Sequence, residues 1–375
     1  MAPGRSRRKL CYILPAYSPS IAEHYGHVPR LLEEIARLCD LAVVVERPGG
    51  RLRIPGAKVI HQRARRWPWR FIELLGILWR LNSQGYKRVF VRISTPAALA
   101  AGIVRRIRGG RVVVWRSGPR IGADMGQLFF LLVLRLVDKL ATGPKAMVKR
   151  MCADWALAEV KVCLLANDVD TDLYVPDPEK REHIRTALGI AEDEVVVLSV
   201  GRISRVRRMP RYIPGAWLEP AREGARFVLV GGGDELWEIM RATERVGLKS
   251  ATIFTGELPQ LMVRGIYYAG DVFFLASGAE GFPRVVLEAM AMGLAVVATD
   301  VGGVKEILPP EQRRFVMPAD DVDGLGRALR VLVQDEALRR RLGKANRQWV
   351  VENYDTRVVA RMYVDKLLGE GECGA

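Results

Sequence analysis

The strongest constraint on the fold is a regular alternation of short β-type runs with longer helical patterns. Residues 9–17 (KLCYILPAY), 41–46 (LAVVVE), 88–94 (RVFVRIS) and 111–117 (RVVVWRS) are such runs, rich in β-branched residues. The alternation restarts at residues 194–200 (EVVVLSV) and continues through the other β-type runs of the second half. Strands that alternate with helices predict parallel sheets covered by helices, so the fold class is α/β with two doubly wound domains.

Domain boundaries are expected where the pattern breaks. The segment 167–190 is polar and contains proline, which is typical of a hinge between domains. We therefore expect a first Rossmann-like domain over residues 1–175, a second over 176–353, and a C-terminal helix with a tail over 354–375.

Composition excludes several classes of protein. The chain has 375 residues, of which 49% are hydrophobic and 27% charged, as in ordinary globular proteins. Its longest apolar runs, such as residues 128–134, are far shorter than the roughly 20 residues of a membrane-spanning helix. The basic start lacks the apolar length of a signal peptide, and the five cysteines lack the paired spacing of a metal site. We expect a cytoplasmic protein with reduced thiols.

Charge is divided unevenly along the chain. Residues 1–150 hold 29 Lys and Arg against 8 Asp and Glu, a net charge of +21, whereas residues 151–375 have a net charge of −5. The first half is therefore expected to meet an anionic partner. Residues 63–81 (RARRWPWRFIELLGILWRL) mix aromatic with basic side chains, which suits an anionic membrane surface. The alternative is that residues 70–81 form an internal helix of the first domain.

Two arginines follow the first strand of the second half. In SVGRISRVRR, Arg202 comes directly after the strand and Arg207 five residues later, so both guanidinium groups can reach one site. Two fixed cations suit a diphosphate, and a solvated basic loop is the alternative. The run VLVGGGDE, residues 228–235, is compatible either with a phosphate-binding loop or with a tight turn.

Two acids stand eight positions apart in ASGAEGFPRVVLEAMAMGLAVVATDVGG, residues 276–303. Glu280 lies in a loop after a strand, Pro283 suits the first turn of a helix, and Glu288 lies inside that helix. The free amides of the helix start favour an anion, and the carboxylates can accept hydrogen bonds from sugar hydroxyl groups. A solvent-facing helix residue is the alternative for Glu288.

These motifs together resemble a known family. The array GRISRVR, FTGEL, EGFPRVVLEAMAMGLAVVATDVGGVKEIL and LLANDVDTDLYVP is similar to the retaining glycosyltransferases of family 4, the group 1 glycosyltransferases. The resemblance implies a GT-B fold, in which two Rossmann-like domains face a central cleft. It also implies a hexosyltransferase that uses a nucleotide-diphosphate sugar as donor and a lipid-linked or cell-envelope glycan as acceptor.

The resemblance also implies roles for individual residues. The catalytic group would comprise Glu280, which holds donor-sugar hydroxyls, with Arg202 and Arg207 on the diphosphate. Further donor-binding residues would be Glu288 at the ribose, Gly281 and Phe282 along sugar and phosphate, and Phe254 and Gly256 at the base. Acceptor-side residues would be Gly26, His27 and Arg116. No metal or other cofactor is implied, because the two cations neutralise the leaving diphosphate.

The chain departs from the family pattern at several positions. Arg116 stands where many relatives have histidine, Arg207 where lysine is usual and Arg208 where glycine is usual, while Pro283 removes one backbone donor. Three other functions stay open: a nucleotide-sugar epimerase of the same fold, a non-catalytic nucleotide-sugar-binding protein and a nucleic-acid-binding protein. No nucleic-acid motif is present, so no nucleic-acid partner is expected. The motifs do not identify the nucleotide, the sugar or the acceptor.

Overall fold

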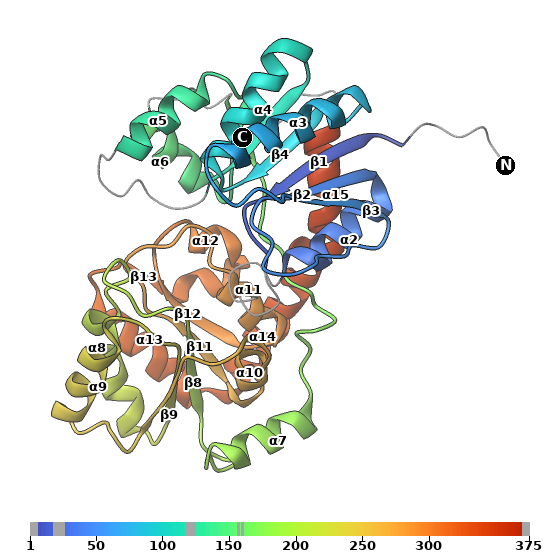
Figure 1. Ribbon diagram of the computed structural model, residues 1–375. Helices are drawn as coiled ribbons and strands as arrows, with labels where there is room; N and C mark the ends of the chain where they lie inside the picture. The colour runs from blue at the N-terminus through green and yellow to red at the C-terminus, as the bar shows by residue number, and fades with distance from the viewer. Residues whose placement is uncertain (1–6, 18–26, 117–124, 156–157, 159–160, 370–375) are drawn as a thin grey trace. The chain divides into compact units, whose positions relative to one another are not determined.

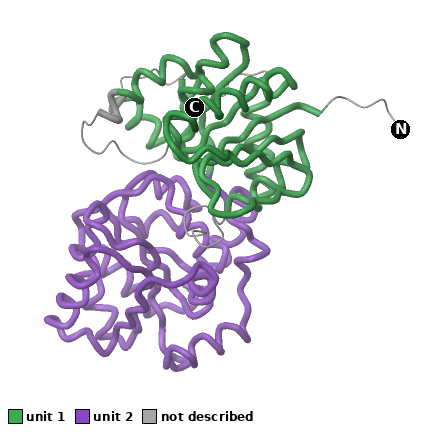
Figure 2. The backbone as a smooth tube through the Cα atoms, viewed as in Figure 1, with its two compact units in different colours: residues 1–166, 356–375 green, residues 167–355 purple. Residues whose placement is uncertain are grey.

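The structure is a computed structural model that describes residues 7–17, 27–116, 125–155, 158 and 161–369. The chain forms two compact units, which Figure 2 shows in different colours. The first unit comprises residues 1–166 and 356–375, and the second comprises residues 167–355. Each unit contains a parallel β-sheet with helices, which confirms the α/β class predicted from the alternating pattern.

The first unit is built on a parallel sheet whose described strands have the order β3-β2-β1-β4-β5-β6-β7. Figure 1 labels β1, β2, β3 and β4 of this sheet. The strands are β1 (Lys9–Leu14), β2 (Asp40–Val45), β3 (Ala57–His61), β4 (Arg88–Arg92), β5 (Arg111–Trp115), β6 (Lys139–Thr142) and β7 (Val162–Leu164). Its helices are α2 (Val28–Leu38), α3 (Trp69–Ser83), α4 (Thr95–Arg108), α5 (Met125–Leu134), α6 (Lys145–Trp155) and α15 (Thr356–Leu368). In the register, Cys11 of β1 lies opposite Ala42 of β2 and Val89 of β4.

Helix α15 belongs to the first unit although it ends the described chain. It packs against α2, β1 and β4. The Tyr363 side chain is fully buried, its ring lies 5.5 Å from that of Phe90, and its hydroxyl donates to the carbonyl of Ala166. The structural boundaries therefore fall at 166/167 and 355/356, compared with the expected 175/176 and 353/354. The helix joins the first unit because its apolar face completes that unit's core.

The second unit repeats the architecture with the strand order β10-β9-β8-β11-β12-β13. The strands are β8 (Val196–Val200), β9 (Arg226–Val230), β10 (Thr252–Gly256), β11 (Val272–Leu275), β12 (Ala295–Thr299) and β13 (Val316–Met317). The helices are α7 (Pro178–Ala187), α8 (Met209–Arg222), α9 (Leu236–Arg245), α10 (Gln260–Ile266), α11 (Arg284–Ala291), α12 (Val304–Ile307), α13 (Val322–Gln334) and α14 (Glu336–Asn353), with 3-10 turns η2 (Tyr267–Ala269) and η3 (Pro310–Phe315).

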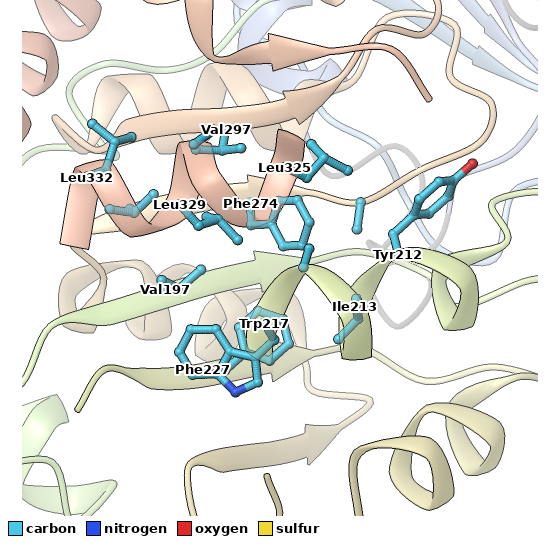
Figure 3. Packing of buried hydrophobic residues seen from close by; sticks show 14 of the residues in the cluster. Val197, Tyr212, Ile213, Trp217, Phe227, Phe274, Val297, Leu325, Leu329 and Leu332 are labelled. Carbon is cyan, nitrogen blue, oxygen red and sulfur yellow. The ribbon is translucent and has the colours of Figure 1, made fainter. Parts of the chain in front are cut away.

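A hydrophobic core joins this sheet to helices α8 and α13 (Figure 3). Trp217 of α8 lies against Phe227 of β9, with ring centroids 5.1 Å apart, and Phe274 of β11 lies in the same cluster. Leu325 and Leu329 of α13 are both fully buried. Burial of large apolar side chains on one face of the sheet fixes the position of each strand end, and the site lies at those ends.

The cysteines do not all follow the expectation of reduced thiols. Cys11, Cys39 and Cys152 carry free thiols, whereas Cys163 of β7 is disulfide-bonded. Spacing along the chain does not determine which sulfur atoms meet in space, and the expectation is wrong at Cys163. Among the described residues, no helix is long and apolar enough to cross a membrane.

Candidate active site

Arg207 and Glu280 meet at the carboxyl edge of the second unit's sheet. Arg207 lies in the loop after β8 and Glu280 in the loop after β11, and these two strands are neighbours. Nε of Arg207 lies 3.2 Å from Oε1 of Glu280, and Nη2 lies 3.5 Å from Oε2. The structure thus joins two residues that are 73 positions apart in the sequence. In open α/β sheets, this edge is where ligands bind.

The carboxylate of Glu280 is buried but incompletely hydrogen-bonded. The residue is 8% exposed, and Oε1 has no hydrogen-bond partner among the described residues. Nε of Arg207 lies close enough to Oε1 for an ion pair, but its N–H is not directed at that oxygen. Burial raises the pKa of Glu280, while the charge of Arg207 opposes the shift. A buried carboxylate oxygen without a donor is costly, so a ligand hydroxyl would stabilise it.

Glycines allow the surrounding loops to approach one another closely. A Cβ atom on Gly302 would lie 2.0 Å from the carbonyl oxygen of Glu280, and one on Gly233 would lie 1.7 Å from that of Ile203. Both glycines have positive φ, 57° and 145°. The amide of Ile203 also donates to the carbonyl of Gly232 at 2.9 Å. The glycine run 231–233 therefore packs the loop after β9 against the loop after β8, which is a structural role.

The other basic residues of the first loop differ in their surroundings. Arg202 is exposed, and its carbonyl oxygen accepts a hydrogen bond of 3.3 Å from Nη1 of Arg207. Arg208 adopts a left-handed backbone with φ of 54° directly before helix α8. Arginine at the position where the resemblance expects glycine therefore occupies the conformation that glycine adopts most easily.

Glu288 lies on helix α11, inside a buried polar network. Its Oε2 accepts a hydrogen bond of 3.0 Å from the hydroxyl of Tyr267, and its Oε1 lies 3.6 Å from Nη2 of Arg284. Burial, followed by the charge of Glu288, raises the pKa of the Tyr267 hydroxyl well above its usual range. The pKa of Tyr174 is raised for the same two reasons. With 7% exposure, Glu288 is not a solvent-facing helix residue.

The remaining donor-side residues lie along the same strand ends. Phe254 of β10 is half-buried against the core, and Gly256 ends this strand with φ of 67°. Phe282 is buried, and its carbonyl oxygen accepts a hydrogen bond of 3.0 Å from the Asn167 side chain. The carbonyl oxygen of Gly281 lies beside Gly302. Backbone groups therefore make up much of this edge.

The acceptor-side residues expected from the sequence lie in the first unit. Nε2 of His27, directly before α2, lies 3.1 Å from Nη2 of Arg92, and Nη1 of Arg92 donates to the hydroxyl of Tyr12 at 3.1 Å. Arg116 follows β5, and its guanidinium lies over the ring of Phe130 at 4.5 Å. Gly26 lies outside the described residues. The adjacency of β1 and β4 brings Arg92 beside Tyr12.

The acidic motif 168–172 has local structural roles. Oδ1 of Asp170 accepts hydrogen bonds from the amides of Asp172 and Leu173, and Asp168 is buried with Oδ1 3.9 Å from Nη1 of Arg284. The described residues contain no group of three or more His, Cys, Asp or Glu side chains positioned to hold a metal ion. The expectation of a metal-free reaction stays a prediction.

Several residues around the two acids were not identified from the sequence. Tyr267 and Arg284 contact Glu288, and Gly302 borders Glu280. Arg284 stands four residues before Glu288 on one helix, a spacing that brings side chains together and could have indicated it. Tyr267 offered no such signal, because it reaches Glu288 from a different element.

Helix α3 in the first unit exposes an apolar stripe. Trp69, Ile72 and Trp79 are 66%, 54% and 41% exposed, whereas Leu74, Leu78 and Leu81 on the same helix are buried. The helix is therefore part of the first unit's core on one side and apolar on its solvent side as well. Exposed apolar residues are common on folded proteins, but these three share one face of the helix.

The second unit contains the residues that match a known family. Residues 180–349 match the family model described as glycosyl transferases group 1. The GDP-mannose-dependent alpha-(1-6)-phosphatidylinositol monomannoside mannosyltransferase of Mycolicibacterium smegmatis is 26% identical over 310 residues, which cover 78% of this chain and 79% of that protein. The sulfoquinovosyl transferase SQD2 of Arabidopsis thaliana is 31% identical over 60% of this chain and 43% of that protein.

Solved structures match the whole chain. A glycosyltransferase from Rickettsia africae ESF-5 superposes with a TM-score of 0.76 at 15% identity, covering 98% of this chain and 100% of that one. HepE of Anabaena, solved in complex with UDP and glucose, gives a TM-score of 0.72 at 17% identity, covering 97% and 100%. These similarities confirm the GT-B fold expected from the sequence.

Proposed function

Because residues 180–349 belong to the glycosyl transferases group 1 family, we propose that this chain is a retaining glycosyltransferase. It moves a hexosyl unit from a nucleotide-diphosphate sugar to a lipid-linked or cell-envelope glycan acceptor. The observation that carries the proposal is the buried carboxylate of Glu280, which is paired with Arg207 and has one oxygen without a hydrogen-bond donor among the described residues. A donor-sugar hydroxyl supplies that missing partner.

The donor is held by groups of opposite charge. Arg202 and Arg207 bind the diphosphate and stabilise the charge that develops on it as it leaves, so the reaction needs no metal ion. Glu280 positions the sugar through its hydroxyl groups. The backbone at Gly281 and Phe282 lines the sugar and the phosphates.

The nucleoside is held deeper in the same unit. Glu288 binds the ribose. A carboxylate has about four hydrogen-bond acceptor positions, and the contacts with Tyr267 and Arg284 leave some of them for a ribose hydroxyl group. Phe254 and Gly256 line the base at the end of β10.

A screen of donors tests the function directly. The purified protein is incubated with UDP-, GDP- and ADP-sugars in the presence and absence of a chelator, and release of the nucleoside diphosphate is measured. Hydrolysis or transfer from one donor class, unchanged by the chelator, supports the proposal. Absence of turnover and of nucleotide binding for every donor would contradict it.

The two acids are distinguished by separate measurements. Glu288→Ala is expected to weaken binding of the bare nucleoside diphosphate, whereas Glu280→Ala spares that binding and lowers transfer. Calorimetric titration with UDP and GDP measures the first effect, and the donor assay measures the second. Equal losses of bare nucleotide affinity in the two variants would refute the division of roles.

We further propose that the first unit docks on the anionic inner face of the membrane from the cytoplasm, where the acceptor is presented. The support is the net charge of +21 over residues 1–150 together with the exposed stripe Trp69, Ile72 and Trp79. Each basic residue near such a surface contributes up to about 1 kcal/mol, and the attraction is screened within roughly 10 Å at 0.1 M salt.

Co-sedimentation with liposomes tests the docking. Binding to anionic liposomes is expected, with loss at high salt and in the double variant Trp69→Ala/Trp79→Ala. Trp237→Ala is the matched control, because Trp237 is 59% exposed on α9 of the second unit. Equal binding to neutral and anionic liposomes, or an equal loss in the control, would remove the membrane from the proposal.

A further inference from the structure

Arg208 holds a left-handed backbone conformation that its own side chain makes costly. Its φ of 54° and ψ of 36° lie in the region that glycine adopts most easily, because an L side chain crowds the backbone there. Neighbouring residues fix this conformation: the amide of Arg208 donates to the carbonyl of Ser204 at 3.2 Å, and its carbonyl oxygen accepts from the amide of Arg211 at 3.1 Å. Strain that a fold retains is concentrated at functional sites, so a role of this side chain in ligand binding is worth testing.

The Arg208 side chain lies beside the loop that carries Glu280. A Cβ atom on Gly278 would lie 3.6 Å from Cδ of Arg208 and 3.2 Å from the carbonyl oxygen of Arg207. The amide of Gly278 donates to that same carbonyl oxygen at 2.6 Å. Because Gly278 precedes Glu280 by two residues, the aliphatic part of Arg208 lies against the segment that leads to the buried carboxylate.

The guanidinium group of Arg208 is exposed and unpaired. It makes no hydrogen bond and no ion pair with any residue that the structure describes. The preceding residue differs, because the guanidinium group of Arg207 is paired with Glu280 and donates to the carbonyl of Arg202. Arg208 is therefore a cation next to the candidate site whose charge remains available to a ligand.

The cations of this loop outnumber the phosphates of a nucleoside diphosphate. Under the proposed function, Arg202 and Arg207 bind the two phosphates, and Glu280 holds the sugar. Arg208 adds a further guanidinium group on the side of the Glu280 loop, where the sugar is held. The planar fork of a guanidinium group matches a carboxylate, which it can bind through two parallel hydrogen bonds. An acidic group on the sugar would supply this anion.

We propose that the transferred hexosyl unit carries a carboxylate, as a hexuronic acid does, and that Arg208 binds this carboxylate. Arg208 then selects acidic donor sugars over neutral ones, and the strain of its backbone is offset by that contact. Glycine at this position would remove both the strain and the selectivity. The inference rests on the proposed glycosyltransferase function, because it names the sugar of the same donor site.

Matched pairs of donors test the assignment with the full chain. UDP-glucuronate and UDP-glucose differ only at C6, as do UDP-galacturonate and UDP-galactose, and GDP-mannuronate and GDP-mannose. Binding is measured by calorimetric titration without an acceptor, so that an acidic group of the acceptor does not contribute. The acidic member of at least one pair is expected to bind about tenfold more tightly, since a charge-assisted hydrogen bond is gained. The preference is expected to decrease at high salt, because Arg208 is exposed.

Three variants locate the preference at Arg208. Arg208→Gly is expected to fold, because glycine suits the left-handed backbone, and to bind the two members of each pair equally. Arg208→Lys keeps the charge without the planar fork and is expected to keep part of the preference. Arg211→Gln, at an exposed position in the first turn of α8, is the matched control and is expected to keep all of it. An undiminished preference in Arg208→Gly, or an equal loss in Arg211→Gln, would overturn the proposal.

Bare nucleotides separate this inference from the proposed function. If UDP or GDP binds but the members of every pair bind equally well, the inference fails and the glycosyltransferase stands. If Arg208→Gly weakens binding of the bare nucleotide as strongly as Arg207→Ala does, Arg208 belongs to the diphosphate site and the inference again fails alone. If neither bare nucleotides nor donors bind, the proposed function fails, and the assignment of the sugar fails with it.

Discussion

The two sheets present similar carboxyl edges that are built in different ways. Each edge holds a buried glutamate, Glu280 in the second unit and Glu46 in the first. In both, one carboxylate oxygen has no hydrogen-bond partner among the described residues. Glu280 is paired with Arg207 and its backbone carbonyl lies against Gly302, whereas Glu46 lies in a cavity bordered by aromatic and basic side chains. Backbone contacts fix one edge and side chains shape the other.

This difference matches the distribution of family similarity. The group 1 family model covers residues 180–349, which lie inside the second unit. An edge built from backbone contacts tolerates little change, because a single Cβ atom collides with a neighbouring carbonyl. An edge built from side chains can be altered one residue at a time.

The largest expected effect breaks the backbone contacts of the second edge. Gly233→Ala is expected to lower the free energy of unfolding by roughly 3 kcal/mol or more, because its Cβ would meet the carbonyl of Ile203 and its φ of 145° disfavours side chains. Denaturant unfolding followed by circular dichroism measures it. Gly247→Ala, with φ of 76° and open space around its Cβ, is the control and should lose only about 1 kcal/mol. Equal losses would show that the loop contact is unimportant.

The second prediction removes the cation that pairs with Glu280. Arg207→Ala is expected to weaken UDP or GDP binding about tenfold to a hundredfold, because charge-assisted hydrogen bonds contribute roughly 1.5 to 3 kcal/mol. Isothermal titration gives the affinity. Arg205→Ala, an exposed residue of the same loop, serves as control. If both variants bind the nucleotide with equal affinity, the basic residues of this loop do not form a diphosphate site.

The third prediction relieves strain beside the same edge. Arg208→Gly is expected to raise the free energy of unfolding by roughly 0.5 to 1 kcal/mol, because the left-handed backbone at φ of 54° costs arginine more than glycine loses in chain entropy. In contrast, Arg211→Gly, inside helix α8, is expected to lose about 1 kcal/mol. Thermal unfolding of the two variants measures the gain in stability of one and the loss in the other. A loss in Arg208→Gly would mean that the arginine side chain stabilises the loop.

The smallest expected effect is the pH dependence of stability that arises from the two glutamates. The folded-state pKa of both is raised by burial above the ordinary value of 4.5, so each folded state holds its proton more tightly than the unfolded chain. Their contribution to stability is present below pH 4.5 and is lost as pH rises through the raised pKa. Glu280→Gln and Glu46→Gln should therefore gain stability relative to the wild type across this window. Parallel pH profiles for variant and wild type would show that burial has not shifted the pKa.

The sequence by itself determined the architecture and the central pair of the candidate site. Alternating apolar runs identified both parallel sheets, because β-branched strands and amphipathic helices have different periods. The resemblance to the group 1 glycosyltransferases placed Arg207 and Glu280 in one donor site, and the neighbouring strands β8 and β11 bring the two side chains together. The glycines of 231–233 were visible as a motif, but their role as spacers was not.

Only the tertiary structure decided which distant groups meet. The return of α15 to the first unit, the bonded state of Cys163 and the contact of Tyr267 with Glu288 all join segments whose separation no local pattern encodes. The same holds for Glu46, which the sequence shows only as an acid at the end of a strand. Its burial and its open oxygen arise when β1, β3, β4 and α3 surround it, since desolvation depends on neighbours from every packed element rather than on the residue itself.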